Sequence, residues 1–565
     1  MADNTKSLDE LISLQNNTDW DIEEQRRQLL HQLYSLIANW KGQLPDLSQI
    51  FQPEEIDWLL VQDGFSDESW PYMFSILEFV THTKYRNNPD VDEDGKLSLR
   101  RTTALHRLAR KSSPNLGSRM FEFFVIYDRF DVNYVDETGF THFHVACRFG
   151  CKDIVKKFLK HGQDPNCVWP ETGDSPLHLA LAYEYEYEVK RQLVKLLLKS
   201  GADPNWANKN GVTPLHIISK NEEEPDMAKI FFNITDKLQL TLHVDAQNKL
   251  GETPLHLAVF SHQVALAELL LKRGADYNLA SKDGSTPLHI ACKMENNILA
   301  VQKIFSYYDQ RDHPVQINEK DKLGRTPLQW AVASLSPIVV DVLLDHKADL
   351  SNFVFPTEDY FAEKYTLDCT LQVVVFHTMS IVHSLERKGY QMDQTAAITI
   401  MKTFAKHGLI DESMDICECL RSDEEFARIA KRQLVTPDMS LYDFLQLPPE
   451  EAEKVFTMDR DKFVYEEFTS EIADLCDDSH KAYITHLCGT VAGGFFRRWA
   501  LKLFSEMNPY PPTPPKINDL WNICMEYAGQ DTQWLAYVRN DDVKKYYNRK
   551  LHLSYYSGEI VTKKI

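Results

Sequence analysis

The sequence predicts an all-α protein built around a solenoid of stacked helical repeats. Tetrapeptides of one shape recur along the middle of the chain, as TALH, THFH, SPLH, TPLH, TPLH, TPLH and TPLQ, starting at residues 103, 141, 175, 213, 253, 286 and 326. Their starts are 33 to 40 residues apart, a period typical of solenoid repeats. An extended repeat surface recognises partners without a catalytic cleft, so these two observations favour a binding protein.

Residues 1–97, which precede the repeats, carry a helical pattern. Apolar residues from Leu29 to Trp40 fall on one helical face, and Pro53 followed by two glutamates marks a second helix start. A third helix is expected around Met73 to Thr83. We expect these helices to cover the apolar end of the first repeat. A free-standing interaction module is the alternative.

Each repeat is expected to consist of a helix, a turn, a second helix and an extended finger. Thr or Ser caps the first helix, Pro suits its first turn, and the Leu points inward. In the fifth repeat, a second helix from Ala265 to Arg273 should end at Gly274, which can adopt the left-handed backbone conformation.

Residues 98–352 resemble the ankyrin repeat. The segment LGETPLHLAVFSHQVALAELLLKRGADYN, from Leu250 to Asn278, is close to the family consensus, and KNGVTPLH, KDGSTPLH and KLGRTPLQ repeat its start. The resemblance implies about seven repeats, a protein-binding role, and a packing role for the tetrapeptide histidines. The last repeat has Gln329 in place of His, as expected of a terminal unit with one neighbour.

The tips of the predicted fingers carry a run of lysines. The residue two positions before the Gly of each finger is, in order, Glu137, Glu171, Lys209, Lys249, Lys282 and Lys322. In a chain of formal net charge −21, four successive lysine tips are a local exception. They predict an acidic peptide or helix as a partner. The alternative is that exposed turns accept lysine without any binding role.

The chain after the repeats divides into a helical connecting region, residues 353–437, a domain from 438 to 545, and a tail, residues 546–565. Helices are expected near Thr370 to Lys388 and Gln394 to Cys419. Within this domain, residues 438 to about 530 resemble the PRANC domain that follows ankyrin repeats in poxviruses and parasitoid wasps, with Ser440-Leu441-Tyr442-Asp443 as the best marker. In that family the domain ends in an F-box-like segment that docks on the adaptor subunit of a cullin ubiquitin ligase.

A docking helix is predicted in this last domain. Pro511, Pro512, Pro514 and Pro515 cannot lie inside a helix, so a helix must begin after them. Ile517, Leu520 and Trp521 then form an apolar stripe that could bind a ligase adaptor. Burial of this stripe in the core of its own domain is the alternative. Recruitment of a ligase therefore competes with a passive scaffolding or sequestering role.

Composition and motifs exclude several other functions. The acidic net charge argues against nucleic-acid and anionic-membrane binding. No secretory signal, membrane span or disulfide framework is evident, so we expect a cytoplasmic and/or nuclear protein. Phosphate-binding loops and hydrolase, metalloprotease or kinase motifs are absent, so we predict no enzyme and no cofactor, leaving only an unrecognised arrangement as an enzymatic alternative.

Two local features remain. Cys476, His480, His486 and Cys488 include zinc-ligand residue types, but one continuous helix cannot present all four, so ordinary packing is favoured. The segment YEYEYE, Tyr183 to Glu188, lengthens the third repeat, and we expect it to form a protruding, solvated turn.

Overall fold

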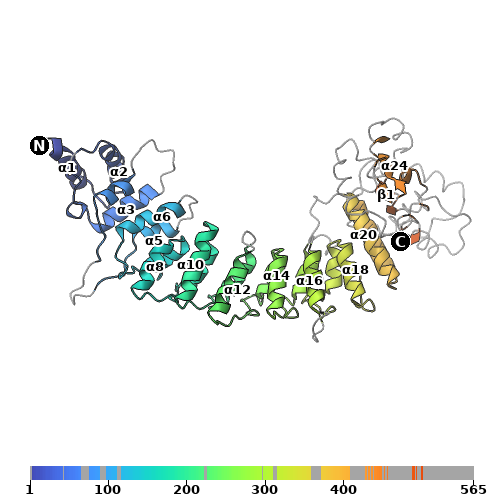
Figure 1. Cartoon of the computed structure of the whole chain (residues 1–565). Coiled ribbons are helices and arrows are strands. Elements are labelled where there is room, and N and C mark those ends of the chain that lie inside the picture. The colour runs from blue at the N-terminus through green and yellow to red at the C-terminus, as the bar shows by residue number, and fades with distance from the viewer. Residues whose placement is uncertain are drawn as a thin grey trace, which may run out of the picture. The chain divides into compact units, whose positions relative to one another are not determined.

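The computed structural model describes residues 3–447 with gaps at 42, 65–74, 90–96, 111–115, 222–225, 295–296, 309–314, 358–370, 407–426, 429, 433 and 437. It also describes residues 451, 455, 487–489, 491–492, 495 and 498–499 (Figure 1). The chain divides into two compact units. The first contains residues 1–291 and 303–315, and the second contains residues 292–302 and 316–565.

The repeats form seven helix pairs in the described part of the chain, as predicted for an all-α solenoid. The first helices of the pairs are α5 (Ala104–Arg110), α7 (His142–Arg148), α9 (Pro176–Ala182), α11 (Pro214–Lys220), α13 (Pro254–Phe260), α15 (Pro287–Lys293) and α17 (Pro327–Ala333). The second helices are α6 (Leu116–Ile126), α8 (Lys152–Lys160), α10 (Tyr187–Lys199), α12 (Met227–Lys237), α14 (Val264–Lys272), α16 (Ile298–Tyr308) and α18 (Pro337–Asp345).

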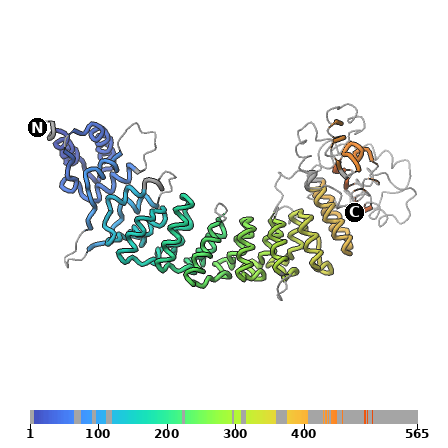
Figure 2. Tube along the Cα trace, in the orientation of Figure 1, coloured from blue at the N-terminus to red at the C-terminus, as the bar shows by residue number. Residues whose placement is uncertain are grey.

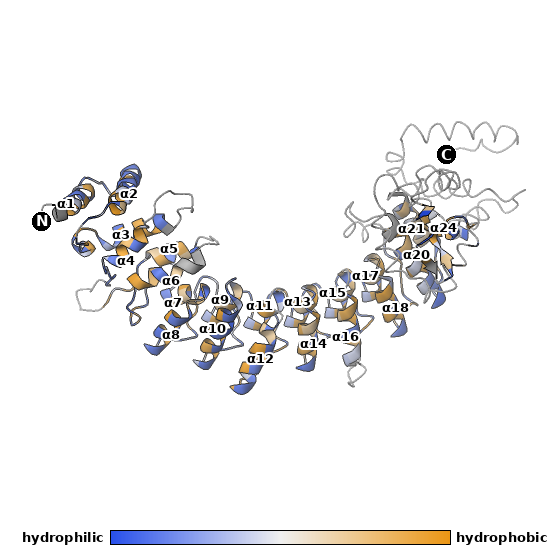
Figure 3. Ribbon diagram, turned by 45° about the horizontal axis from the view of Figure 1, so that its top comes forward, coloured by the Kyte–Doolittle hydropathy of each residue, from blue (hydrophilic) through white to orange (hydrophobic). Residues whose placement is uncertain are grey.

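Within the first unit these helices form two layers. The first helices α7, α9, α11 and α13 pack side by side, and the second helices α8, α10 and α12 form the other layer (Figure 3). The Cα trace shows the pairs following one another along the unit (Figure 2). The tetrapeptide leucines lie between the layers, because Leu105, Leu177, Leu215 and Leu255 are at most 2 % exposed.

The predicted caps are present. Thr253 accepts a hydrogen bond from the His256 backbone N–H, and the His256 side chain accepts one from the Thr253 backbone N–H at 3.1 Å. This reciprocal capping box satisfies two donors that would otherwise lack partners at the helix start. At the other end of the pair, α14 stops before Gly274, whose φ of 93° is the left-handed conformation expected there.

The described residues of the N-terminal region form four α-helices and one 3₁₀ turn. They are α1 (Asp3–Asn16), α2 (Glu23–Ala38), η1 (Leu47–Gln49), α3 (Pro53–Gly64) and α4 (Ile76–His82). Three of them correspond to the predicted helices, whereas α1 was not predicted. Its described side chains include one fully buried apolar residue, Leu11, so the helix has too narrow an apolar stripe to be recognised from periodicity.

Helices α3 and α4 pack on the first repeat in the manner of a further pair. Helix α3 lies against α5, and α4 lies against α6. The contact contains a buried ion pair in which Arg101 Nη2 lies 2.5 Å from Asp57 Oδ2, and the Tyr127 hydroxyl donates to the same carboxylate. Burial raises the pKa of Asp57, because a buried site disfavours the charged form of its carboxyl group. The ion pair with Arg101 and the hydrogen bond from Tyr127 stabilise that charged form. This packing supports the covering role expected for the N-terminal helices.

The second unit contains α17, α18 and further elements. Helix α20 (Leu371–Arg387) packs on α18, and α21 (Gln394–Lys406) packs on α20. Both begin where predicted, although residues 407–426 of the second predicted helix lie outside the described residues. Strands β1 (Leu434–Thr436) and β2 (Met439–Ser440) pair antiparallel ahead of the short helix α24 (Leu441–Phe444), which Ser440 caps through the Asp443 N–H.

The tyrosine-rich insert does not form the protruding turn that we expected. The Tyr183 hydroxyl accepts a hydrogen bond from Arg148, whose guanidinium lies 4.3 Å from the centre of the tyrosine ring. Tyr185 donates to the Ala180 carbonyl at 2.6 Å. The alternation of Tyr and Glu explains the difference, because the first two tyrosines pack on the protein while Glu184 and Glu186 remain exposed.

No helix in the described ranges is long and apolar enough to cross a lipid bilayer.

Candidate protein-interaction surface

The finger tips are tight turns that require glycine. Gly251 has φ of 75°, and a Cβ at this position would lie 2.7 Å from the backbone nitrogen of Lys282 in the next finger. Gly211 has φ of 73°, and its Cβ would meet the backbone of Asn248 and Lys249. Glycine is needed here because the backbone has a positive φ and because the backbones of neighbouring tips approach each other closely.

Backbone hydrogen bonds join successive tips in the first unit. The N–H of Lys209 donates to the Thr172 carbonyl at 3.0 Å. The N–H of Lys249 donates to Asn210, and that of Lys282 to Leu250, each at 2.7 Å. These bonds fix three lysines at three adjacent tips. The packing of the repeats therefore fixes the backbone position of each of these lysines.

The lysine side chains at the tips have no partner among the described residues. Lys209, Lys249 and Lys282 are exposed, and their ammonium groups form no ion pair or hydrogen bond with the residues that the structure describes. Lys322, at the corresponding position of the second unit, is also exposed. The acidic tip Glu137 differs, because Thr102 and Arg110 donate hydrogen bonds to it and lower its pKa to about 2.

The tetrapeptide histidines form hydrogen bonds to the fingers of the following repeats. In His256, Nδ1 accepts the Thr253 N–H, so the proton is on Nε2, which donates to the Ser285 carbonyl of the next finger at 3.0 Å. His216 makes the corresponding bond to the Glu252 carbonyl at 3.0 Å. Each histidine thus joins the start of one helix to the following finger. These bonds account for the packing role that the resemblance implied.

Burial keeps these histidines neutral. The pKa of His144 is lowered to about 4, chiefly by burial, and burial also lowers the pKa of His178, His216 and His256. A neutral imidazole is required, because a protonated Nδ1 could no longer accept the bond from the cap.

A second set of hydrogen bonds between repeats, which we call the asparagine ladder, lies at the base of the fingers. The sequence pattern did not predict it. Asn205 donates to the Thr241 carbonyl at 2.7 Å and accepts from the His243 N–H at 2.8 Å, both in the next repeat. Asp245 occupies this place one repeat later and accepts from the Asp276 N–H at 2.9 Å. The spacing of six residues before Gly211 and Gly251 was the signal that could have revealed this ladder.

Most of the other predicted sites fall on residues that the structure does not describe. Ile517, Leu520 and Trp521 lie outside the described residues, as do Cys476, His480 and His486, while Cys488 is buried. The described residues contain no group of His, Cys, Asp or Glu side chains that could hold a metal ion. Cys147 and Cys151 are buried in the repeats, and burial raises the pKa of Cys151 to about 12, in keeping with a core-filling role.

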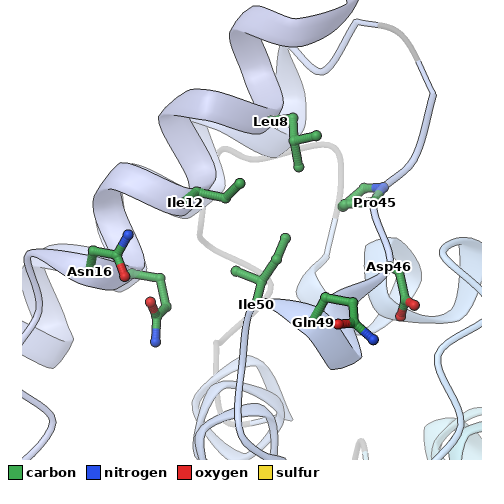
Figure 4. Close-up of a pocket in the computed structure, with 8 residues that line it drawn as sticks. Leu8, Ile12, Asn16, Pro45, Asp46, Gln49 and Ile50 are labelled. Carbon is green, nitrogen blue, oxygen red and sulfur yellow. The ribbon is translucent and has the colours of Figure 1, made fainter.

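A shallow groove of about 350 Å³ lies between α1 and the η1 turn (Figure 4). Its walls are formed by Leu8, Ile12, Pro45 and Ile50, together with amide side chains and Asp46. The N–H and the hydroxyl of Ser48 both donate to Oδ1 of Asp46. The groove therefore combines an apolar surface with one exposed carboxylate.

Comparison with protein families decides the identity of the repeats. The family of ankyrin repeats matches residues 74–169, 105–191, 177–281 and 278–353. This chain is an ankyrin-repeat protein. The matched residues include α4 and the seven helix pairs, and no PRANC or F-box family is among the matches.

Similar proteins match through this array. Mouse inversin is 31 % identical over 206 residues, 36 % of this chain and 18 % of inversin. Mouse NF-kappa-B inhibitor alpha is 34 % identical over 151 residues, which cover 24 % of this chain and 47 % of the inhibitor. The fowlpox virus ankyrin repeat protein FPV031 is 25 % identical over 266 residues, 45 % of this chain and 72 % of the viral protein. The chain thus spans less than a fifth of inversin.

Proposed function

We propose that this chain is a protein-binding adaptor whose fingertip lysines capture an acidic segment of a partner protein. Ankyrin repeats bind proteins through extended surfaces of stacked units. The observation that carries the proposal is the ladder of backbone bonds at the tips. It holds Lys209, Lys249 and Lys282 at adjacent positions while their ammonium groups stay free of partners in the described chain.

The charge balance supports an acidic partner. With a net charge of −21, the molecule as a whole repels acidic proteins, so attraction must come from a local positive surface. Aligned lysines provide such a surface, and at physiological salt their field extends for about 8 Å. Oppositely charged segments that come within this distance are steered to the tips, which raises the association rate.

Charge reversal at the tips tests this proposal. We expect the combined change of Lys209, Lys249, Lys282 and Lys322 to Glu to lower the association rate of a synthetic poly-glutamate peptide by about tenfold or more. The dissociation rate should change less, and the salt dependence of association should disappear. Stopped-flow fluorescence at several ionic strengths measures all three quantities.

A matched variant controls for net charge. Lys156, Lys160, Lys199 and Lys237 are exposed on the second helices, and their reversal to Glu alters the net charge by the same amount. This variant should retain most of the steering, because its changed charges are not at the tips. Equal loss of association in both variants would show that only the overall charge matters.

The adaptor role includes, in our proposal, recruitment of a cullin-type ubiquitin ligase by the C-terminal region. The support is the sequence pattern of Ile517, Leu520 and Trp521 after four prolines, together with the similarity of the repeats to poxviral ankyrin proteins. Passive scaffolding or sequestration without a ligase is the competing function.

A charged double variant separates docking from core packing. Ile517→Asp with Leu520→Asp should abolish co-purification of the ligase adaptor with the full chain while the circular dichroism spectrum stays unchanged. The pair Asn518→Asp with Asn522→Asp, off the stripe, should retain the adaptor. Loss of helical signal together with binding would assign the stripe to the domain core, since buried charge unfolds a core helix.

A further inference from the structure

The tyrosine-rich insert contains three tyrosines that differ in their exposure to solvent. Tyr183 and Tyr185 are half-buried, and the hydroxyl of each forms a hydrogen bond to the protein. Tyr187 is the first residue of α10 and is 36 % exposed. Among the tyrosines whose burial the structure describes, it alone belongs to the exposed residues. Of these tyrosines, Tyr187 is therefore the most accessible to a modifying enzyme.

Packing on the preceding repeat explains the burial of the other two tyrosines. The guanidinium of Arg148, the last residue of α7, lies over the Tyr183 ring. A Cβ on Gly150 would lie 2.7 Å from Cδ2 of Tyr185, so this ring fills the space beside the glycine. The alternation that places both rings on the protein ends where α10 begins, at Tyr187.

The segment before Tyr187 has a backbone and a charge that suit the substrate groove of a tyrosine kinase. Tyr183 has φ of −100° and ψ of 145°, and Glu186 has φ of −44° and ψ of 124°, so neither residue is helical. Glu184 and Glu186 are exposed. Kinases select substrates partly by the charges around the acceptor residue. An acidic, non-helical segment therefore leads directly to the exposed tyrosine.

The first turn of α10 lacks the cap that holds the first helices of the repeats. The N-cap residue Glu186 makes no side-chain hydrogen bond to the helix start, whereas Thr213 and Thr253 form capping boxes. A helix without such a cap opens more easily at its first turn. Tyr187 can thus enter a kinase active site while residues further along, such as Leu193, stay buried.

The groups around Tyr187 can accommodate a phosphate. Phosphorylation adds a charge of about −1.5 to −2 at neutral pH, and the start of a helix favours negative charge. Arg191 lies one turn along α10 on the same face, and it forms an ion pair with Glu188. The charge of Glu188 is thereby balanced, while Glu184 and Glu186 are exposed to water, which screens their repulsion.

We infer that Tyr187 is a phosphorylation site for a tyrosine kinase that prefers acidic substrates. The Tyr187 hydroxyl oxygen forms a bond to the γ-phosphorus of ATP, and the bond from that phosphorus to the β–γ bridging oxygen breaks. ADP leaves, and the hydroxyl proton passes to the catalytic base of the kinase. The site lies between α9 and α10, at the end of the helix pair opposite the fingers. The inference therefore goes beyond the proposed function and does not depend on it.

Phosphorylation of the folded chain and of a peptide tests the inference. The full-length chain and a synthetic peptide of residues 180–192 are each incubated with ATP, Mg²⁺ and a purified, acid-directed tyrosine kinase domain. Mass spectrometry then locates phosphate within the fragment that carries the three tyrosines. We expect the ratio of phosphate on Tyr187 to phosphate on Tyr183 and Tyr185 to be about tenfold higher in the folded chain, because packing protects those two only there.

Substitutions separate the acceptor from its acidic surroundings. Tyr187→Phe should remove the phosphate from this fragment of the folded chain. Glu184→Gln with Glu186→Gln should slow phosphorylation by about threefold or more, because the kinase loses its charge contacts. Glu122→Gln with Glu171→Gln removes the same charge from exposed positions elsewhere in the repeats and should leave the rate unchanged.

Three results would overturn the inference. A folded chain without phosphate on this fragment, while the peptide is phosphorylated, would show that α10 keeps Tyr187 out of reach. Equal phosphorylation of the three tyrosines in the folded chain would show that packing does not select Tyr187. An unchanged rate after Glu184→Gln with Glu186→Gln would exclude an acid-directed kinase. Circular dichroism of each variant confirms that the repeats remain folded.

Discussion

At the scale of single residues, the repeats are held together by polar groups that act across the boundary between one repeat and the next. His256 bonds to the following finger, and Asn205 bonds to the base of the following repeat. The His256 bond is half-buried, and such a bond costs more to lose than an exposed one, because an unpaired group remains behind. Two positions where the pattern varies allow this to be tested.

The first variation is Asp245, which takes the place of an asparagine. Its carboxylate accepts the Asp276 N–H but has no donor for the carbonyl of the next repeat, and burial raises its pKa. We expect Asp245→Asn to stabilise the protein by about 1 kcal/mol at neutral pH, as measured by urea denaturation. The reverse change, Asn205→Asp, should destabilise by a similar amount.

The pH dependence gives the second test of Asp245. Because its folded pKa lies above the unfolded value, the group favours the folded state when protonated and loses this contribution as the pH rises through the folded pKa. The advantage of Asp245→Asn should therefore shrink as the pH falls through the raised folded pKa, and should level off below the unfolded value of about 4. An unchanged advantage in acid would contradict the assignment.

The second variation is Gln329, which replaces histidine in the last tetrapeptide. It reproduces both bonds, accepting from the Thr326 N–H at 2.9 Å and donating to the Val354 carbonyl at 2.9 Å, and it does not titrate. His144 has a folded pKa of about 4, below its unfolded value of 6.5. Its contribution is therefore present above pH 6.5 and is lost as the pH falls toward 4.

His144→Gln should retain the fold and remove this acid sensitivity. The slope of unfolding free energy against pH between 6.5 and 4 should decrease by about one proton, or about 1.4 kcal/mol per pH unit. Urea denaturation at a series of pH values measures the slope. A variant with the wild-type slope would show that His144 does not take up a proton on unfolding.

At the scale of elements, stability comes from apolar side chains between the two helical layers. Leu255 of α13 is fully buried, whereas Leu250 at the preceding fingertip is 62 % exposed. Both are leucines within six positions of the same repeat, so their comparison isolates the effect of burial. The flanking pair α3 and α4 extends the layers by covering the first repeat.

Leu255→Ala should therefore destabilise the protein by about 2 to 5 kcal/mol, since it removes buried methyl groups and leaves a cavity. Leu250→Ala should change stability by no more than about 0.5 kcal/mol. Chemical denaturation of the two variants provides the measurement. Similar losses in both would mean that the register of α13 is wrong.

At the scale of the whole molecule, an acidic chain combines a row of fingertip lysines with a C-terminal region outside the ankyrin repeats. A chain that ends at Val435 retains the repeats and lacks the PRANC-like region. We expect it to bind the poly-glutamate peptide with unchanged affinity and to lose every cullin-ligase subunit. Affinity purification of both chains, followed by mass spectrometry, makes the comparison.

Two results would contradict this division of roles. Ligase subunits that remain with the shortened chain would place their binding site on the repeats. Their absence from the full chain would favour the passive scaffold or sequestering function over recruitment.

The sequence by itself determined the repeats of this protein and the turns between them. Helix caps, the inward leucines and the glycines at the finger tips each depend on local chemistry, in which a residue type suits one backbone conformation. For that reason the tetrapeptides located the helix pairs, and the lysine tips could be counted back from the finger glycines.

Only the tertiary structure decided which of these residues act together. The bonds between tips, the asparagine ladder and the packing of Tyr183 on Arg148 all join residues at least 31 positions apart. Such contacts depend on how repeats stack, and the pattern within one repeat does not specify them. Helix α1 could not be predicted for the related reason that its burial depends on the helices beside it.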